Sequence, residues 1–286
     1  MPSPIDGIVL VDKPAGITSH DVVAGVRRAL GRGVKVGHAG TLDPFATGLM
    51  IVLVGRGTRA QRFFMALGKS YDVVARLGWT STTGDVEGEI APGRLPSDPL
   101  SLPIGSLRQR PPAYSAVKIG GRRAYALARA GVEVEIPERT VVVSRFDLVA
   151  RKGETARFVI ECGSGTYVRS LIADLGDAYC TALRRTAIGS FRVEDADPDV
   201  IVPLGQGLSF LPSVTLDAEH ARVAGFGVAV PSPNQPGRTP SHSEPLLGPV
   251  GSVVRLLDPD GDLIALAEPR DTEQGPVLKP IVGLRG

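Results

Sequence analysis

Residues 37–54 read Gly-His-Ala-Gly-Thr-Leu-Asp-Pro-Phe-Ala-Thr-Gly-Leu-Met-Ile-Val-Leu-Val, a glycine-rich loop that runs into a compact apolar segment. The apolar segment, residues 49–54, is short and unbroken, which is typical of a buried β-strand. The loop before it contains three glycines and Pro44, residues that interrupt regular structure. We therefore expect Asp43 to lie in a loop held at the edge of a buried strand. Taken alone, an aspartate before a proline most often only forms a turn, because the proline restricts the preceding backbone.

Hydrophobic periodicity predicts a mixture of helices and strands around this loop. Residues 18–31 have helical spacing, with a hydroxyl residue at either of the first two positions as the N-cap and Gly31 as the stop. Residues 166–178 also have helical spacing, and Arg169 stands off their apolar stripe. Alternating or β-branched residues predict strands at 71–77, 141–149 and 158–162. These elements lack the regular order of βαβ units, so we expect an α+β fold.

The composition is that of an ordinary folded protein. Of the 286 residues, 43% are hydrophobic and 22% are charged, which excludes a disordered chain and allows either one large domain or a large and a small one. No segment resembles an export signal or is long enough to span a membrane, so we expect a cytoplasmic protein. The two cysteines, Cys162 and Cys180, are expected to be buried as small hydrophobic residues.

The net charge is only +2, but the basic residues are unevenly distributed. Residues 105–131 contain no acidic residue and six basic ones, which are Arg108, Arg110, Lys118, Arg122, Arg123 and Arg129. Such a stretch is either a solvated face or a surface that binds phosphates, and composition alone does not separate the two.

Several short patterns that suggest other chemistry can be set aside. Residues 19–21 are Ser-His-Asp, but adjacent side chains on a helix diverge, so we expect a helix cap and not a hydrolytic triad. Residues 68–70 end like a phosphate-binding loop but lack its upstream glycine and precede a strand. Residues 258–262 resemble the start of a calcium loop, yet its twelfth position is Pro269, so we expect a hairpin turn. We expect no metal site.

The loop around Asp43 also matches a family signature at every position. Residues 37–48 resemble the G-H-x-G-T-L-D-P-x-A-[ST]-G signature of the TruB family of pseudouridine synthases. Further blocks similar to those of the family are Lys13-Pro-Ala-Gly-Ile-Thr-Ser19, Lys69-Ser-Tyr71, Pro111-Pro-Ala-Tyr-Ser-Ala-Val-Lys118, Gly165-Thr-Tyr-Val-Arg-Ser170 and Leu183-Arg-Arg185. Together these blocks cover roughly residues 7–191, so chance similarity is not a reasonable explanation.

The resemblance implies an enzyme that breaks the bond between uracil and ribose, turns the base and rejoins it through carbon 5. Asp43 would then be the catalytic nucleophile, and Arg169 would pair with it. Burial would raise the pKa of the Asp43 carboxyl group, and the neighbouring guanidinium would lower that pKa by roughly 1 to 3 units. The reaction needs a nucleophile and an acid or base, so we expect no cofactor.

The same resemblance implies the contacts with the substrate. Tyr71 would stack on the target uracil and its hydroxyl would assist proton removal at carbon 5, although a buried strand tyrosine is the competing interpretation. His38 would fill the place that the flipped-out base leaves in the RNA stack. Tyr167 and Leu183 would line the base pocket, although ordinary core packing also accounts for the leucine. The remaining residues expected to bind substrate are Lys13, Lys69, Lys118, Arg122 and Arg123.

The implied fold is the pseudouridine synthase fold, a mostly antiparallel central sheet over residues 1–216 with an RNA-gripping insertion at about 92–131. Residues 217–286 would form a small β-rich, PUA-like module, interrupted by the proline-rich residues 231–245. The expected substrate is uridine 55 in the T arm of tRNA, and we expect a monomer with no protein partner. Two alternatives remain, a non-catalytic protein that binds or folds RNA and a synthase that acts on another RNA.

Overall fold

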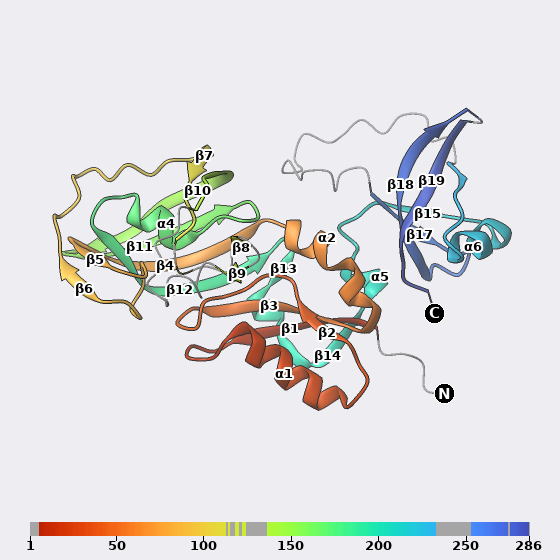
Figure 1. Cartoon of the computed structure of the whole chain (residues 1–286), viewed down its shortest axis with the longest axis horizontal. Coiled ribbons are helices and arrows are strands. Elements are labelled where there is room, and N and C mark those ends of the chain that lie inside the picture. Colours follow the sequence, from red (N-terminus) through yellow and green to blue (C-terminus); the bar gives the residue numbers. More distant parts are fainter. Residues whose placement is uncertain are drawn as a thin grey trace.

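The computed structural model describes residues 6–112, 114, 118–119, 122–123, 136–232, 253–273 and 275–285. The molecule is elongated, with a large sheet in its N-terminal part and a smaller sheet near the C-terminus (Figure 1). None of the helices in these ranges is long and apolar enough to cross a membrane.

The large sheet has ten strands, and eight of them follow the order β14-β1-β3-β12-β4-β11-β10-β7, with β2 paired to β3 and β13 to β12. These strands are β1 (Gly7–Lys13), β2 (Val36–His38), β3 (Thr47–Val54), β4 (Lys69–Leu77), β7 (Gly105–Gln109), β10 (Arg139–Lys152), β11 (Thr155–Cys162), β12 (Ala178–Ile188), β13 (Phe191–Arg192) and β14 (Asp197–Pro203). Among the described strand pairs of this large sheet, every pairing is antiparallel except that of β12 with β3. The predicted α+β fold with a mostly antiparallel sheet is confirmed.

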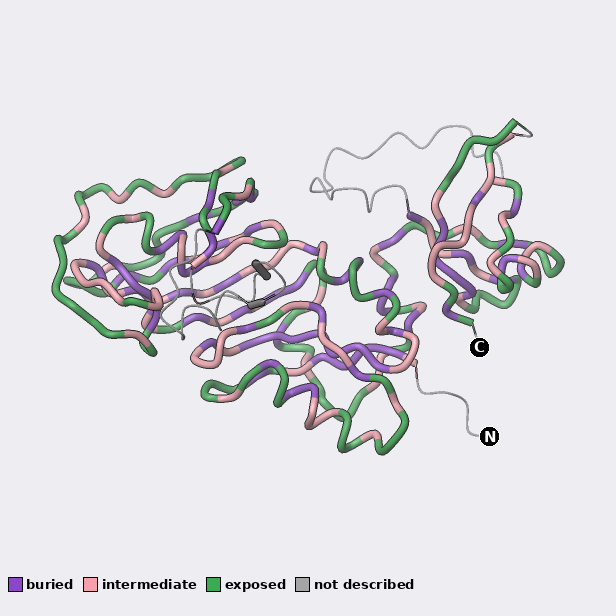
Figure 2. Tube along the Cα trace, viewed as in Figure 1, coloured by how far each residue is buried: buried purple, intermediate pink, exposed green. Residues whose placement is uncertain are grey.

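Strand β3 is buried on both of its faces, as its continuous apolar sequence predicts. Met50 and Val52 face one hydrophobic core, whereas Leu49 and Ile51 face the other. Strand β4 instead alternates, with the odd-numbered residues from Tyr71 to Leu77 buried and the intervening residues only half-buried. The buried residues consequently gather along the central strands (Figure 2). Cys162 and Cys180 lie among them as buried free thiols, as expected.

Helix α1 (Ser19–Leu30) begins and ends where its sequence predicts. Thr18 is the N-cap: its hydroxyl accepts a hydrogen bond from the Asp21 amide at 3.1 Å, and the Asp21 carboxylate accepts one from the Thr18 amide at 2.8 Å. Gly31 ends the helix with a φ of +85°. The Ser-His-Asp pattern at 19–21 is therefore part of a helix cap, as expected. Short helices elsewhere are η1 (Gly55–Ala60), α2 (Gln61–Ala66), η2 (Val193–Asp195) and α5 (Leu204–Gly207).

The helix predicted at 166–178 is much shorter in the structure. Helix α4 covers only Val168–Ala173, and β12 begins at Ala178. Gly176, with a φ of +123°, lies in a backbone conformation that a right-handed helix cannot contain, so the helical pattern is cut there despite its apolar spacing. The short helix still places Arg169 at its second residue.

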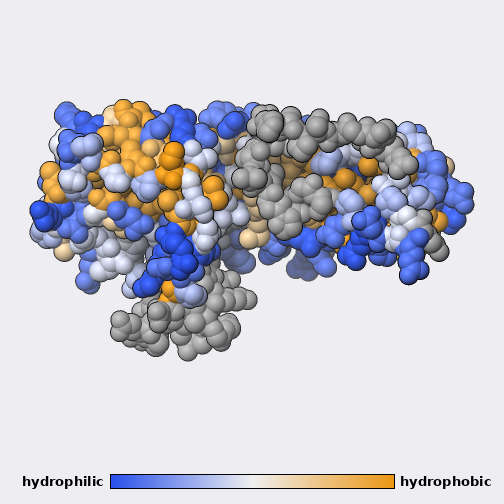
Figure 3. All heavy atoms as spheres, turned by 90° about the horizontal axis from the view of Figure 1, so that it is seen from above, coloured by the Kyte–Doolittle hydropathy of each residue, from blue (hydrophilic) through white to orange (hydrophobic). Residues whose placement is uncertain are grey.

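A long exposed segment joins the small strands β5 (Trp79–Ser81) and β6 (Ile90–Pro92) to β7. Hydrophobic side chains gather on the surface at the end of the molecule where β7 and β10 lie (Figure 3). Ile104 and Val142, in and beside these strands, are more than half exposed. Within the basic stretch, β8 (Lys118–Ile119) pairs with β9 (Arg122–Arg123). The side chains of both strands, and residues 124–135, lie outside what the structure describes.

The C-terminal sheet has the order β15-β17-β18-β19-β16 and carries helix α6 (Ala218–Gly225). Its strands are β15 (Ser213–Thr215), β16 (Val230–Pro231), β17 (Val254–Leu257), β18 (Leu263–Thr272) and β19 (Gly275–Gly283). The turn between β17 and β18 is organised by Asp258, whose carboxylate accepts from the amides of Asp260 and Asp262, so the predicted hairpin turn is confirmed. Most of the proline-rich segment, residues 233–245, lies outside the described ranges.

Candidate active site

The loop between β2 and β3 presents Asp43 and is held by polar contacts from several elements. The Ser19 hydroxyl, in the first turn of α1, donates to the Leu42 carbonyl at 3.0 Å and accepts from the Leu42 amide at 2.8 Å. The Gly16 amide donates to the Pro44 carbonyl at 2.8 Å. Because the residues on both sides of Asp43 are hydrogen-bonded to other segments, the loop is fixed in place before any substrate binds.

Lys13 contributes to this support, and the contact with substrate expected of it stays a prediction. Its side chain is completely buried, and its ammonium donates to the carbonyls of Pro14 and Ile17 at 2.9 Å and of Pro44 at 3.1 Å. All three of its N–H groups therefore have partners within the protein. Burial lowers the pKa of Lys13, and the nearby Asp43 carboxylate opposes that shift. Lys13 thus joins β1 to the Asp43 loop.

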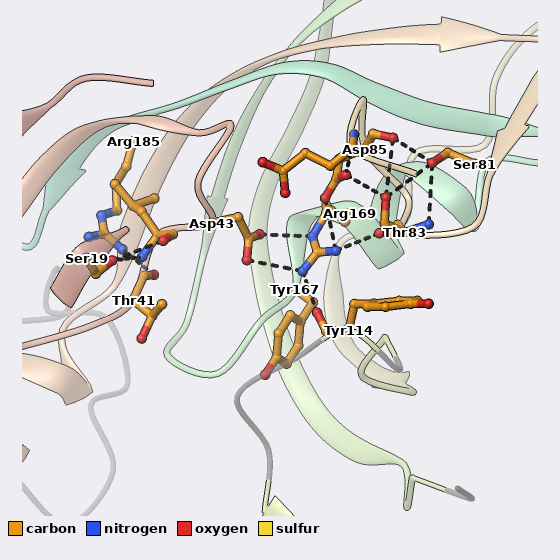
Figure 4. Close-up of polar contacts among 12 residues, drawn as sticks. Ser19, Thr41, Asp43, Ser81, Thr83, Asp85, Tyr114, Tyr167, Arg169 and Arg185 are labelled. Carbon is orange, nitrogen blue, oxygen red and sulfur yellow. Dashed lines mark hydrogen bonds and ion pairs between the residues drawn. The ribbon is translucent and has the colours of Figure 1, made fainter. Parts of the chain in front are cut away.

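Asp43 and Arg169 come together although 126 residues separate them in the chain. The Arg169 Nε lies 2.9 Å from Asp43 Oδ2, and its Nη2 donates to Asp43 Oδ1 at 3.2 Å (Figure 4). Only 4% of the arginine side chain is exposed, whereas 33% of the aspartate side chain is exposed. The guanidinium is thus locked inside the protein, and its carboxylate partner remains open to a ligand.

The beginning of α4 is itself held by a buried amide side chain from β7. The Tyr167 amide donates to Gln109 Oε1 at 2.8 Å, and Gln109 Nε2 donates back to the Tyr167 carbonyl at 3.0 Å. Gln109 is only 2% exposed. The Tyr167 ring lies under the Arg139 guanidinium at 4.6 Å from its centroid. These contacts fix the position of the turn from which Arg169 projects.

Asp85 is a second carboxylate partner of Arg169, and sequence reasoning missed it. Its Oδ2 lies 3.1 Å from Arg169 Nη1, and it is almost completely buried. Asp85 is held in turn by the Thr83 hydroxyl at 2.6 Å and the Glu87 amide at 3.0 Å. Arg169 also donates to the carbonyls of Thr83 at 2.6 Å and Tyr114 at 2.9 Å (Figure 4). In the sequence, Thr83-Gly-Asp85 looks like an ordinary polar turn, and only its burial beside a cation distinguishes it.

The pKa of the Asp43 carboxyl group is raised from its ordinary value, mainly because the group is buried. Arg169 opposes this shift, as expected, but the negative charge of Asp85 adds to the effect of burial. Burial and Arg169 thus act on this pKa in the directions expected from the sequence. The net shift is upward because burial outweighs the guanidinium, and the charge of Asp85 acts in the same direction as burial.

Tyr71 and Leu183 lie on adjacent strands, facing the same core. Tyr71 is 8% exposed, and burial raises the pKa of its phenol to about 12, against the opposing effect of Arg185. The phenol is therefore neutral near pH 7. Leu183 is opposite Val73 and packs in the same hydrophobic core as Tyr71. Core packing thus accounts for much of its environment, and its contact with a base remains a prediction.

His38, in β2, lies half-buried just before the loop. Its Nδ1 accepts a hydrogen bond from the Gly40 amide at 3.3 Å, and its carbonyl accepts one from the Gln61 amide group at 2.7 Å. Burial and the charge of Arg185 lower the pKa of the imidazole, which is therefore neutral near pH 7. A neutral planar ring agrees with a stacking role and gives no support to a role as a cation.

Lys69 also has partners within the protein. Its ammonium donates to the carbonyls of Met65 and Leu67 at the end of α2, and burial lowers its pKa to about 8. Lys69 thus caps the end of α2, and its expected contact with RNA stays a prediction. Lys118, Arg122 and Arg123 lie on β8 and β9, and the orientation of their side chains lies outside the described residues. Groups of three or more His, Cys, Asp or Glu side chains able to hold a metal are absent from the described ranges.

Comparisons with known proteins agree on one family. Residues 27–168 match the family model described as TruB family pseudouridylate synthase (N terminal domain). The chain is 41% identical to tRNA pseudouridine synthase B of Rhodococcus jostii over 300 residues, which cover 95% of this chain and 93% of that protein. It is 41% identical to the Thermobifida fusca protein of the same name over 303 residues, covering 96% and 98%.

Solved structures show the same fold at lower sequence identity. An H/ACA RNP bound to a substrate RNA containing 2'-deoxyuridine has a chain that matches with a TM-score of 0.68 and 21% identity, covering 98% of this chain and 85% of that one. A chain of a Cbf5-Nop10-Gar1 complex matches with a TM-score of 0.67 and 24% identity, covering 97% and 84%. At these identities the likeness establishes the fold.

Proposed function

This chain belongs to the TruB family of pseudouridylate synthases, and we propose that it converts uridine 55 in the T arm of tRNA to pseudouridine. The reaction is an isomerisation. The bond from ribose carbon 1′ to uracil N1 breaks, a bond from carbon 1′ to uracil carbon 5 forms, a proton leaves carbon 5 and N1 gains one. No atom or electron enters or leaves overall, so the protein has to supply a nucleophile and groups that move a proton.

The observation that supports this function best is the pairing of a partly exposed Asp43 with a buried Arg169. We assign Asp43 as the nucleophile because its carboxylate is open to a ligand while its backbone is held on both sides. Arg169 is held by Asp85 and two carbonyls, so it stabilises the charged form of Asp43 without having to reorganise.

Tyr71 and His38 would contact the two places that base flipping creates, which are the extruded base and the gap that it leaves in the RNA stack. A stacked uridine cannot reach Asp43, so the nucleotide must turn out of the RNA, at a cost of a few kcal/mol. We assign stacking on the extruded uracil to Tyr71, whose hydroxyl assists proton removal at carbon 5, and stacking inside the RNA to the neutral His38. Tyr167 and Leu183 would complete the base pocket.

We further propose that residues 217–286 form a PUA-like RNA-binding module and that the enzyme acts as a monomer. Helix α6 and the five-stranded sheet share a separate small core, which supports a division near residue 217. The first strand of that sheet begins slightly earlier, at Ser213. Strands β8 and β9 belong to the segment, at about 92–131, that we propose grips RNA.

The direct test is to incubate the protein with an unmodified tRNA transcript and to map pseudouridine at nucleotide resolution. Asp43→Asn should lower the rate of conversion by more than about 10³-fold, the scale on which removal of a nucleophile acts, while tRNA binding persists. A protein that only binds or folds RNA would give no pseudouridine with either form. A synthase for another RNA would modify a ribosomal RNA fragment and leave the tRNA unchanged. Conversion by Asp43→Asn at the wild-type rate would refute the assignment of the nucleophile.

A further inference from the structure

Arg185 is a buried charge at the centre of the sheet, beside the catalytic loop. It lies on β12 between β3 and β4, with Gly48 as its neighbour on one side and Tyr71 on the other. Only 2% of it is exposed, and among the almost completely buried side chains it is the largest. The strand contains a β-bulge between Arg185 and Ala187, an irregularity that proteins use to redirect a side chain.

The close approach of Gly48 shows how tightly the loop is built onto this arginine. A Cβ atom at Gly48 would lie 2.2 Å from the Arg185 carbonyl oxygen and 2.7 Å from its nitrogen, and the φ of Gly48 is +107°. Only glycine can hold that conformation at that distance. The end of the Asp43 loop therefore rests directly on the backbone of Arg185.

The guanidinium of Arg185 donates to carbonyls on both sides of Asp43. Its Nε donates to the Leu49 carbonyl at 2.7 Å, after the loop. Before Asp43, its Nη1 donates to the Thr41 carbonyl at 3.3 Å (Figure 4). Its Nη2 donates to the Gly40 carbonyl, also at 3.3 Å. One rigid, planar group thus connects the two ends of the loop that carries the nucleophile, a geometry that a lysine ammonium cannot reproduce.

The positive charge of Arg185 also faces groups that the reaction uses. Burial lowers the pKa of the arginine, and the interactions with Tyr71 and Asp43 oppose that shift. By reciprocity, Arg185 lowers the pKa of the Tyr71 phenol and disfavours protonation of Asp43. A buried cation is costly to a fold, and a buried apolar side chain would be tolerated at lower cost. The proposed reaction therefore explains the buried charge of Arg185 better than a contribution to the stability of the fold does.

We propose that Arg185 is a positioning residue for the isomerisation, because its guanidinium clamps both ends of the Asp43 loop and keeps a positive charge beside Tyr71, its neighbour on β4. This inference rests on the proposed function. In it, the clamp keeps the carboxylate aligned with the extruded nucleotide. The positive charge favours the ionised form of Tyr71, which has released its own proton to water and can take up the proton that leaves carbon 5.

The experiment compares Arg185→Met, which removes the charge and the clamp, with Arg185→Lys, which retains the charge. Both variants should lower kcat, by about 10- to 100-fold, with little change in KM, because a small displacement of a reacting group is costly. The acid limb of the kcat profile reports ionisation of Asp43. It should move to higher pH in Arg185→Met and stay in place in Arg185→Lys. The other charged groups that act on Asp43, which are Arg169, Asp85, Lys13 and Glu87, are unchanged in both variants.

Arg184→Met is the matched control. Arg184 is the preceding residue of β12, but its side chain is exposed and pairs with Asp12, at 2.6 Å. This variant should keep the wild-type kcat and acid limb. Each rate is normalised to the folded fraction, which thermal melting gives. If Arg185→Met does not fold, Arg185→Lys tests the positioning role: its kcat should fall while its KM stays unchanged.

Two results separate failure of this inference from failure of the proposed function. If the wild-type protein forms no pseudouridine in tRNA, the proposed function is wrong. If the wild type does so, and the folded Arg185 variants retain its kcat and its acid limb, Arg185 is a structural residue only and the inference is overturned.

Discussion

The Asp85→Asn substitution tests how Arg169 is held between the carboxylates of Asp43 and Asp85. Asparagine has nearly the same volume, and its side-chain oxygen can still accept from the Thr83 hydroxyl and the Glu87 amide. The change therefore removes mainly the negative charge that lies 3.1 Å from Arg169 Nη1. Loss of a buried ion pair costs about 3 to 5 kcal/mol when the remaining charge has no partner. Arg169 keeps Asp43 and two carbonyls, so we expect a loss of about 1.5 to 3 kcal/mol in the free energy of unfolding.

The same substitution should move two kinetic quantities in different ways. Without its second anchor, Arg169 holds Asp43 less firmly, so the rate at the pH plateau should fall by about 10- to 100-fold. The charge of Asp85 raises the pKa of Asp43, so its removal lowers that pKa. Because the nucleophile must be ionised, the acid limb of the profile should shift to lower pH. General misfolding would lower the rate without this shift.

The assay follows conversion of a tRNA transcript from about pH 4 to 9, and denaturant unfolding is followed through Trp79, the single tryptophan of the chain. Asp72→Asn is the control, because Asp72 pairs with Arg157 on an exposed face of the sheet. Its loss should change the free energy of unfolding by less than about 1 kcal/mol and leave the kinetics unchanged. An Asp85→Asn enzyme with the wild-type plateau rate, or with an acid limb displaced to higher pH, would refute the reasoning.

Three further substitutions test other contacts. Gly48→Ala should destabilise the fold by at least about 2 kcal/mol, because its Cβ would clash with Arg185 at a positive φ; urea unfolding should show no such loss for Gly25→Ala in α1, where nothing lies within 4 Å. Tyr71→Phe should keep tRNA affinity in filter binding and lower the single-turnover rate by about 10² to 10⁴-fold, and an unchanged rate would exclude a role for the hydroxyl. Lys69 has a pKa of about 8 in the fold against 10.5 as its ordinary value, so the unfolded chain binds more protons between these values and stability should rise with pH there. Lys69→Met should abolish that rise in unfolding titrations.

Local sequence pattern was sufficient where one segment determines its own structure. The apolar run at 49–54 is a buried strand, and the capping residues around 18–31 mark a helix whose ends agree with the prediction. The helix at 166–178 was overextended because the apolar spacing continues to Leu175, beyond the last helical residue, Ala173. The positive φ of Gly176 then prevents the helix from continuing toward β12. Periodicity reports which face is buried, but it does not report where the element stops.

The candidate site depends on contacts that span the chain, and local pattern could not supply all of them. The family signature pointed to Asp43 and Arg169, and the structure places them in contact. It gave no indication of Asp85, which occupies an unremarkable polar turn. The resemblance to the family implied that Lys13 and Lys69 bind substrate. In the structure both donate to backbone carbonyls, contacts that only the tertiary structure reveals.

Strand β3 sits between two hydrophobic cores and leads directly out of the Asp43 loop. Any movement of the nucleophile along the strand direction would disturb both cores, so amide hydrogens at residues 49–54 should exchange with solvent only when the whole domain opens. The segment at 95–104 lies largely on the surface, so its amide hydrogens should exchange faster. When RNA binds, the protein therefore presents the Asp43 carboxylate in a fixed position. The RNA has to change its conformation to bring a nucleotide to that carboxylate.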